Sequence, residues 1–216
     1  MTKSETDFQF AGSSLCATGL ACQRGGRTVF RDVGFSLQSG EVLIVTGPNG
    51  AGKSSLLRLL AGLVEVANGS LKLEGGAEDA SLGEQAHYIG HLDALKPAMS
   101  VRQTLAFWSD FLGGDASDTD RALEAFDLAG LIDLPVAYLS AGQRRRLSLS
   151  RLLVAPRPLW LLDEPGVALD AASLARLVRV IEAHQAQGGI VIATTHQALD
   201  LVRSKTLELG LSKVNA

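Results

Sequence analysis

The sequence predicts an α/β fold with a mostly parallel sheet at its core and a helical insertion. The first observation is three short apolar runs at Val42–Thr46, Leu159–Leu162 and Ile190–Thr194. None alternates apolar with polar residues, which is typical of strands buried on both faces of a parallel sheet. The second is that helical patterns separate these runs. The third is size: 216 residues, 46% of them hydrophobic, suit one domain with a buried core.

The helical patterns follow the runs in an order that favours βα units. The helices expected on this basis are Ser54–Leu63, Arg144–Ala155 and Ala171–Gln187, each ended by nearby glycine or proline. The stretch 99–138 is also expected to be mostly helical, with a break at Gly113-Gly114-Asp115. We therefore predict one domain over residues 1–216, with a helical subdomain inserted at approximately 93–156.

Composition excludes several classes of protein. A net charge of -3, with 20% charged residues, provides no basic field for nucleic acid or for an anionic membrane surface. The polar start of the chain lacks the apolar run of a signal peptide, and no stretch of 18 apolar residues occurs. Any role at a membrane is thus expected to need another chain as anchor. Cys16 and Cys22 are not spaced for a metal site, which indicates reduced thiols in a cytosolic protein.

A phosphate-binding loop follows the first predicted strand and precedes a predicted helix. The segment Gly47–Ser54 matches G-x-x-x-x-G-K-[ST]. Glycines let successive backbone N–H groups turn toward phosphate oxygens, and the helix adds the positive end of its dipole. Lys53 is expected to bridge the β- and γ-phosphates of a nucleotide, and Ser54 to ligate Mg²⁺. The alternative is a glycine-rich turn that matches by accident. The predicted nucleotide-binding residues of this segment are Gly47, Pro48, Asn49, Gly50, Ala51, Gly52, Lys53, Ser54 and Ser55.

Two carboxylates, Asp163 and Glu164, come at the end of the second predicted strand. Beside a phosphate loop, Asp163 is expected to hold Mg²⁺ through water, opposite Ser54. Glu164 is expected to orient the attacking water as general base. Taken alone, the pair would be an ordinary Asp-Glu-Pro turn leaving a strand. The metal-binding Asp of small GTPases lies much closer to the loop, and the guanine motif N-K-x-D is missing from this sequence, so a GTPase is disfavoured.

A third motif resembles a particular family. The residues Leu139, Ser140, Ala141, Gly142 and Gln143 resemble the L-S-G-G-Q signature of ABC ATPases, with Ala141 in place of a glycine. The resemblance implies a P-loop NTPase of ABC type, with a mostly parallel sheet core and a small antiparallel β part. It also implies a head-to-tail dimer in which this motif reaches the γ-phosphate held by the other copy. The simpler interpretation is a helix N-cap, and both roles use the same geometry.

Further matches to the ABC family follow in the family's order. Ala168-Leu169-Asp170 resembles the D-loop that communicates across the dimer, which assigns that role to Asp170. His196, after the third strand, resembles the switch histidine that contacts the γ-phosphate. With Lys53 and Glu164, it completes the set of catalytic residues that the resemblance implies.

The sequence departs from the family at two sites. Arg24 stands where an aromatic residue normally stacks on adenine, and a guanidinium can also stack on a base. The alternative for Arg24 is a solvated loop charge. His91 or Leu92 takes the place of the glutamine that senses Mg²⁺ and the membrane partner. Of the two, His91 can hydrogen-bond water near the metal, so the metal site is predicted as Ser54 and Asp163 with the region of His91.

Three segments narrow the resemblance further. Tyr88–His91, Pro158–Pro165 and Gln187–Gln197 resemble the ATP-binding subunit of the bacterial cytochrome c maturation exporter, often called the haem exporter. This implies ATP and Mg²⁺ as cofactors, and a peripheral position on the cytoplasmic face of the inner membrane. It also implies a second copy of the chain and integral-membrane subunits as partners, with no nucleic acid. ATP hydrolysis would then drive haem export or the release of a haem-loaded chaperone.

Other functions stay open at this point. The chain is also compatible with the ATPase subunit of another small ABC transporter, or with a soluble ABC ATPase in cofactor or iron–sulfur assembly. A nucleotide-binding module that no longer hydrolyses is disfavoured, because Lys53, Asp163, Glu164 and His196 are all present.

Overall fold

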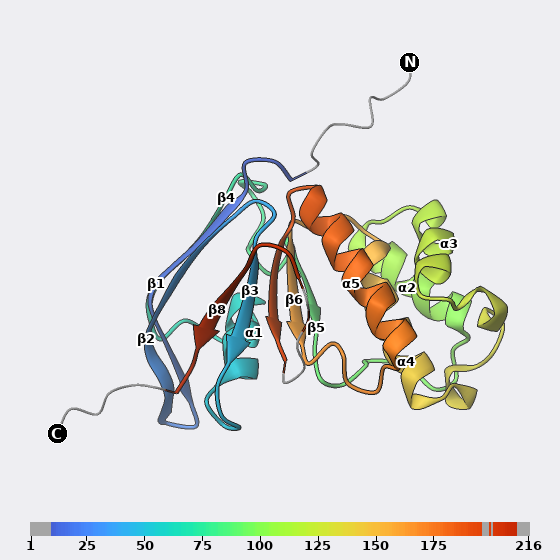
Figure 1. Ribbon diagram of the computed structural model, residues 1–216, viewed down its shortest axis with the longest axis horizontal. Coiled ribbons are helices and arrows are strands. Elements are labelled where there is room, and N and C mark those ends of the chain that lie inside the picture. The colour runs from blue at the N-terminus through green and yellow to red at the C-terminus, as the bar shows by residue number, and fades with distance from the viewer. Residues whose placement is uncertain (1–9, 196–198, 200, 211–216) are drawn as a thin grey trace, which may run out of the picture. The chain divides into compact units, whose positions relative to one another are not determined.

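The three apolar runs fold as neighbouring parallel strands of one sheet. β6 (Leu159–Asp163) pairs with β7 (Ile190–Thr194), and β7 pairs with β3 (Val42–Thr46). Every residue of β6 and β7 is buried, which explains why neither strand alternates. With β5 (Ala86–Ile89) and β8 (Ser204–Glu208) the strand order is β5-β6-β7-β3-β8 (Figure 1). The predicted parallel core is confirmed.

The computed structural model describes residues 10–195, 199 and 201–210. The chain divides into two compact units. The first unit comprises Met1–Tyr88, Arg157–Asp163 and Ile181–Ala216, and the second comprises Ile89–Pro156 and Glu164–Val180. The prediction of one domain with an insertion at approximately 93–156 stays a prediction.

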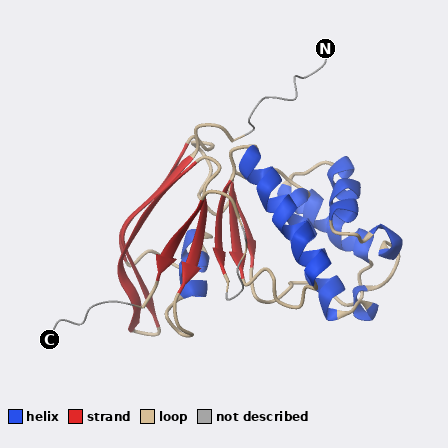
Figure 2. Ribbon diagram, viewed as in Figure 1, coloured by secondary structure: helices blue, strands red, loops and turns tan. Residues whose placement is uncertain are grey.

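An antiparallel sheet accompanies the parallel one in the first unit (Figure 2). Its strands are β1 (Ser14–Arg24), β2 (Arg27–Gln38) and β4 (Asn68–Glu74), in the order β2-β1-β4. β1 pairs antiparallel with both neighbours. The small antiparallel β part implied by the family resemblance is therefore present.

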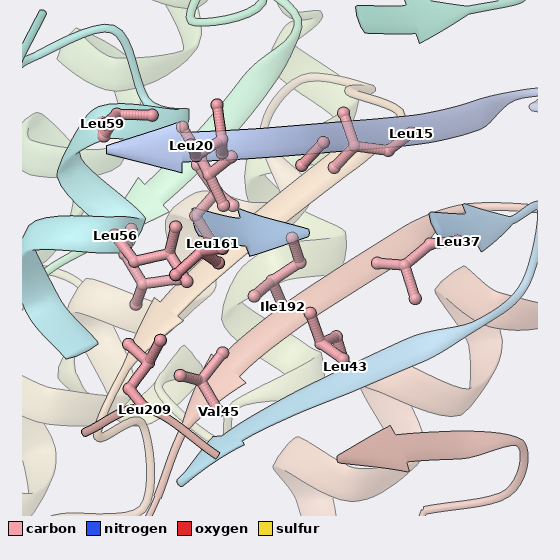
Figure 3. Packing of buried hydrophobic residues seen from close by; sticks show 14 of the residues in the cluster. Leu15, Leu20, Leu37, Leu43, Val45, Leu56, Leu59, Leu161, Ile192 and Leu209 are labelled. Atoms are coloured by element: carbon pink, nitrogen blue, oxygen red, sulfur yellow. The ribbon is translucent and has the colours of Figure 1, made fainter. Parts of the chain in front are cut away.

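Helix α1 (Lys53–Leu60) packs its leucines into the core that both sheets share. Figure 3 shows Leu56 and Leu59 of α1 in one cluster with Leu20 of β1 and with Leu161 and Ile192 of the parallel strands. Each of these side chains is almost fully buried. Burial of a leucine or isoleucine side chain contributes about 1.5–3 kcal/mol, so this contact holds α1 firmly against the sheet. The loop that precedes α1 is thereby fixed at one end by β3 and at the other by α1.

The second unit is helical. It contains α2 (Val101–Leu112), α3 (Ala116–Ala125), α4 (Ala141–Ser150) and the first part of α5 (Ala171–Ala186), with short 3₁₀ segments at Ala129–Leu131, Val136–Tyr138 and Arg151–Leu153. The predicted break lies between α2 and α3, because Gly113 ends α2 in a left-handed conformation and Asp115 caps α3. Within the described ranges, no helix combines the length and apolar character that crossing a bilayer requires.

The boundaries of helices α1 and α4 differ from the prediction. α1 ends at Leu60 rather than at Leu63, because Gly62 adopts a positive φ of 72° just beyond it. α4 begins at Ala141, three residues before the predicted start at Arg144. Ser140 caps it there, so the last three residues of the signature-like motif belong to the helix. After Ser150 the chain continues as a 3₁₀ turn rather than as α-helix.

Candidate nucleotide site

The loop 47–52 joins β3 to α1 and turns on glycines that no other residue could replace without strain. Gly52 has φ 100°, and a Cβ atom there would lie 2.7 Å from Cγ1 of Val29. Gly47 has φ 132°, and a Cβ atom there would lie 2.3 Å from the carbonyl oxygen of Leu209. The backbone therefore passes close to β2 and to the end of β8, in a conformation that brings the loop tightly around the start of α1.

Lys53 is buried at the start of α1 and closes the loop. Its Nζ donates to the carbonyl oxygens of Gly47 at 2.8 Å and Pro48 at 3.2 Å. The N–H groups of the first helical turn have no partner within the helix, and they carry the positive end of its dipole. An entering phosphate would exchange two neutral carbonyl acceptors of Lys53 for charged oxygens, which form stronger hydrogen bonds. The loop is thus built to bind an anion.

Ser54 and Asp163 come into direct contact in the first unit. The Oγ of Ser54 donates to Oδ1 of Asp163 at 3.0 Å. Asp163 is the last residue of β6 and is 2% exposed. Although the two residues are far apart in sequence, the parallel sheet places the end of β6 beside the first turn of α1. They are the pair for which the sequence predicted a role in holding Mg²⁺.

Thr194 is a member of this cluster that the sequence reasoning missed. Its Oγ1 donates to the same Oδ1 of Asp163 at 2.8 Å, and its side chain is fully buried. Thr194 ends β7 directly opposite Asp163 in the parallel register. The available signal was its position, because polar residues at the carboxyl ends of parallel strands gather at one edge of a sheet.

The oxygen atoms of Ser54 and Asp163 are suitable ligands for a magnesium ion. A serine hydroxyl and a carboxylate are hard oxygen ligands, and Mg²⁺ usually combines one or two such protein ligands with phosphate oxygens and water. Ser54 and Asp163 would hold the ion beside the phosphate loop. When bound, it would supply positive charge to the phosphates of the nucleotide.

Glu164 belongs to the second unit and has an unusual backbone conformation. Its φ of 50° lies in the left-handed region, which a glutamate rarely adopts. Its carbonyl oxygen accepts a hydrogen bond of 2.8 Å from Nη2 of Arg145. The residue predicted as general base is therefore held by its main chain in a strained conformation.

The signature-like segment forms the start of α4. Ser140 Oγ accepts from the N–H of Gln143 at 3.2 Å, and Gln143 Oε1 accepts from the N–H of Ser140 at 2.7 Å. This reciprocal capping box confirms the helix-cap interpretation. Ser140 and Ala141 are exposed, so the extra methyl group of Ala141 meets no crowding within the chain. At Gly142 a Cβ atom would lie 3.0 Å from the carbonyl oxygen of Ala168.

Asp170 caps α5 in the second unit. Its Oδ1 accepts a hydrogen bond of 2.8 Å from the N–H of Ser173. That bond is the main reason why the pKa of Asp170 lies below its ordinary value, so its charge is retained at the helix N-terminus. The cap fixes the segment of Ala168-Leu169-Asp170 to the start of the helix.

The remaining predicted residues are placed as follows. Arg24 is exposed at the end of β1, beside the turn to β2. His91 and Leu92 are both exposed in the second unit. His196 lies outside the described residues. Adenine stacking by Arg24, metal sensing near His91 and phosphate contact by His196 stay predictions.

Comparison with known proteins gives concordant matches. The family model described as ABC transporter matches residues 30–167. The chain is 53% identical over 196 residues to the cytochrome c biogenesis ATP-binding export protein CcmA of Nitrobacter winogradskyi, covering 91% of this chain and 98% of that protein. It is 54% identical to the protein of the same name in Rhodopseudomonas palustris strain BisB5, with the same coverage.

A solved structure has the same fold. The putative ABC transporter ATP-binding protein of Pyrococcus furiosus superimposes with a TM-score of 0.78, at 22% identity. The match covers 91% of this chain and 97% of that one. At this identity the likeness concerns the fold, and it agrees with the α/β architecture described above.

Proposed function

This chain belongs to the ABC transporter family, and we propose that it is the ATP-hydrolysing subunit of a membrane complex for cytochrome c biogenesis. The observation that carries the proposal is the contact of Ser54 with Asp163 beside the phosphate loop. That contact unites a hydroxyl and a carboxylate in the arrangement that P-loop ATPases use for the metal of MgATP. Membership of the family makes the chain an ABC ATPase that binds ATP.

Hydrolysis is assigned to this chain's own residues. Lys53 and the N–H groups of the loop bind the β- and γ-phosphates, and Ser54 and Asp163 hold Mg²⁺. Thr194 fixes the carboxylate of Asp163 by donating to it. Glu164 accepts a proton from the attacking water and orients it toward the γ-phosphate. His196 contacts the γ-phosphate in this proposal, as the family resemblance implies.

A second copy of the chain completes the site in the proposal. The signature-like residues Leu139 to Gln143 approach the γ-phosphate held by the other copy, in a head-to-tail dimer. Support comes from the exposure of Ser140 and Ala141 at the N-terminus of α4, where the positive end of the helix dipole favours an anion. The capping role of Ser140 is compatible with this phosphate contact, because capping and phosphate binding use the same geometry at the helix N-terminus.

The role in cytochrome c biogenesis is proposed from the relatives. Proteins more than half identical over nearly their full length are named as ATP-binding export proteins of that process. The chain is then a peripheral subunit on the cytoplasmic face of the bacterial inner membrane, bound to integral-membrane transporter subunits. The same names favour export over a soluble role in iron–sulfur assembly.

The test compares Glu164→Gln with wild type in the complex with its membrane partners. Loss of the general base should lower ATP turnover by about 10²–10⁴-fold while ATP still binds. Lys53→Ala is the matched control, which should lose both binding and turnover. Wild-type turnover by the Glu164→Gln complex would contradict the assignment of the base.

A second measurement separates the biological role from the ATPase activity. A deletion strain carrying Glu164→Gln or Lys53→Ala should fail to accumulate c-type cytochromes, whereas wild type should restore them. The haem content of the periplasmic chaperone in that strain then distinguishes the two predicted outcomes of hydrolysis. With the ATPase inactive, a haem-free chaperone indicates that hydrolysis drives haem export. A chaperone that stays loaded with haem indicates that hydrolysis drives its release. Normal cytochrome levels with an inactive ATPase would contradict the role in biogenesis and leave the ATPase intact.

A further inference from the structure

Arg145 joins three segments of the second unit through one buried guanidinium. The side chain, 4% exposed, donates from Nη1 to the carbonyl oxygen of Gly90 at 2.9 Å and to Oδ1 of Asp93 at 3.2 Å. From Nη2 it donates to the carbonyl oxygen of Glu164 at 2.8 Å, and from Nε to that of Pro165 at 3.3 Å. The segments joined are helix α4, the turn after β6 and the segment after β5.

Two of these acceptors are the main-chain carbonyls of Glu164, the proposed general base, and of Pro165, which follows it. Glu164 has φ 50°, a left-handed conformation in which the Cβ atom of a residue with a side chain is strained. Such a conformation persists when surrounding contacts determine it. Arg145 supplies contacts to this peptide and the next, so it fixes the direction in which the Glu164 side chain leaves the backbone.

An arginine suits this position and a lysine does not. The guanidinium is planar and presents five N–H donors in a fixed fork, whereas an ammonium is a compact charge with three donors. Asp93 compensates the buried charge at 3.2 Å. A lysine at position 145 could keep the ion pair with Asp93, but its single Nζ could not also reach carbonyls of two separate segments.

We propose that Arg145 is the positioning residue of Glu164, and that Arg145 with Asp93 couples the conformation of the base to the segment 90–93. The inference rests on the proposed function, because it assumes that Glu164 activates water. Arg145 touches no reacting atom and acts through the backbone of Glu164. Displacement of the segment 90–93 would move two acceptors of Arg145, the Gly90 carbonyl and the Asp93 carboxylate. The guanidinium would shift with them and change the orientation of Glu164.

The test is the kinetics of Arg145→Lys in the complex with its membrane partners. A misplaced base should lower kcat about 10–100-fold. The KM for ATP should stay within about twofold, because the phosphate loop lies in the first unit and keeps its contacts. Added to Glu164→Gln, the Arg145→Lys change should cause no further loss of turnover, since both act through one group.

The control is Arg146→Lys, on the same helix. Arg146 is also largely buried, but its side chain donates to the carbonyls of Phe126 and Asp127 and pairs with the Asp127 carboxylate. It should lower the free energy of unfolding without the selective loss of kcat. If Arg145→Lys fails to fold, Asp93→Asn serves instead, with the same selective fall in kcat but a smaller one.

Three results would overturn the inference: an unchanged kcat in a folded variant, a loss confined to KM, or equal losses for Arg145→Lys and Arg146→Lys. Failure of the proposed function is distinguishable from these. It would appear as full turnover by Glu164→Gln, whatever Arg145→Lys does.

Discussion

Acid should destabilise the fold of this protein through one buried histidine, His184, near the end of α5. Its ring stacks on Trp160 with centroids 3.8 Å apart and planes 3° from parallel, and the residue is 5% exposed. Burial, aided by the nearby His87, lowers the pKa of His184 from 6.5 to about 3. The ring is therefore neutral in the folded chain at any pH well above about 3.

The sign and size of the effect follow from proton linkage. Between pH 6.5 and about 3, the unfolded chain binds a proton at His184 that the folded chain does not. The free energy of unfolding is highest above pH 6.5 and falls by about 1.36 kcal/mol for each pH unit below it. At about pH 4.5 this one residue removes about 2.7 kcal/mol, a large share of the roughly 5–15 kcal/mol typical of a folded domain.

Urea unfolding of wild type and His184→Phe measures this directly. The phenylalanine keeps an aromatic ring against Trp160 but cannot be protonated. Both chains contain the same carboxylates, so their shared acid sensitivity cancels in the comparison. Between about pH 7.5 and about pH 4.5, wild type should lose about 2.7 kcal/mol more than the variant. Equal losses would refute the claim that His184 is buried in its neutral form.

Two further changes test the nucleotide site. Thr194→Val removes one hydrogen-bond donor from the buried carboxylate of Asp163, so urea unfolding should show a free energy of unfolding lower by about 1–3 kcal/mol. Thr194→Ser should keep the hydrogen bond, and equal stability of the two variants would contradict this contact. Gly52→Ala puts a Cβ atom on a residue with positive φ, 2.7 Å from Cγ1 of Val29, so the phosphate loop must distort. Titration with a fluorescent ATP analogue should then show at least about 10-fold weaker binding, and unchanged affinity would contradict the loop geometry.

Local patterns were sufficient to predict three strands of the parallel sheet, β3, β6 and β7, and most of the helices. β6 and β7 are apolar up to their last residue because both strands are fully buried, and such burial is readable from the sequence. The start of α4 was misplaced although its signal was present. Ser140 and Gln143 form the S-x-x-Q pattern of a capping box, which starts the helix at Ala141.

Contacts that depend on tertiary packing were harder to predict from the sequence. Ser54 and Asp163 were paired in advance because Asp163 ends a buried strand in a chain that carries a phosphate loop, and the structure places Ser54 Oγ 3.0 Å from Asp163 Oδ1. The sequence indicated Thr194 only as the end of an apolar run, since its hydrogen bond depends on the register of β6 with β7. The contacts of Arg145 could not be predicted, because three of its acceptors are backbone carbonyls, which the sequence does not distinguish.

The central claim is that one ATP site is shared by two copies of this chain. Its most direct test is the molecular mass of purified Glu164→Gln in solution, by light scattering, with and without MgATP. The variant is expected to bind ATP without hydrolysing it, so the account predicts the mass of one chain without nucleotide and of two chains with it. Lys53→Ala should stay at one chain in both conditions. A Glu164→Gln chain that binds MgATP yet keeps the mass of one chain would contradict the shared site.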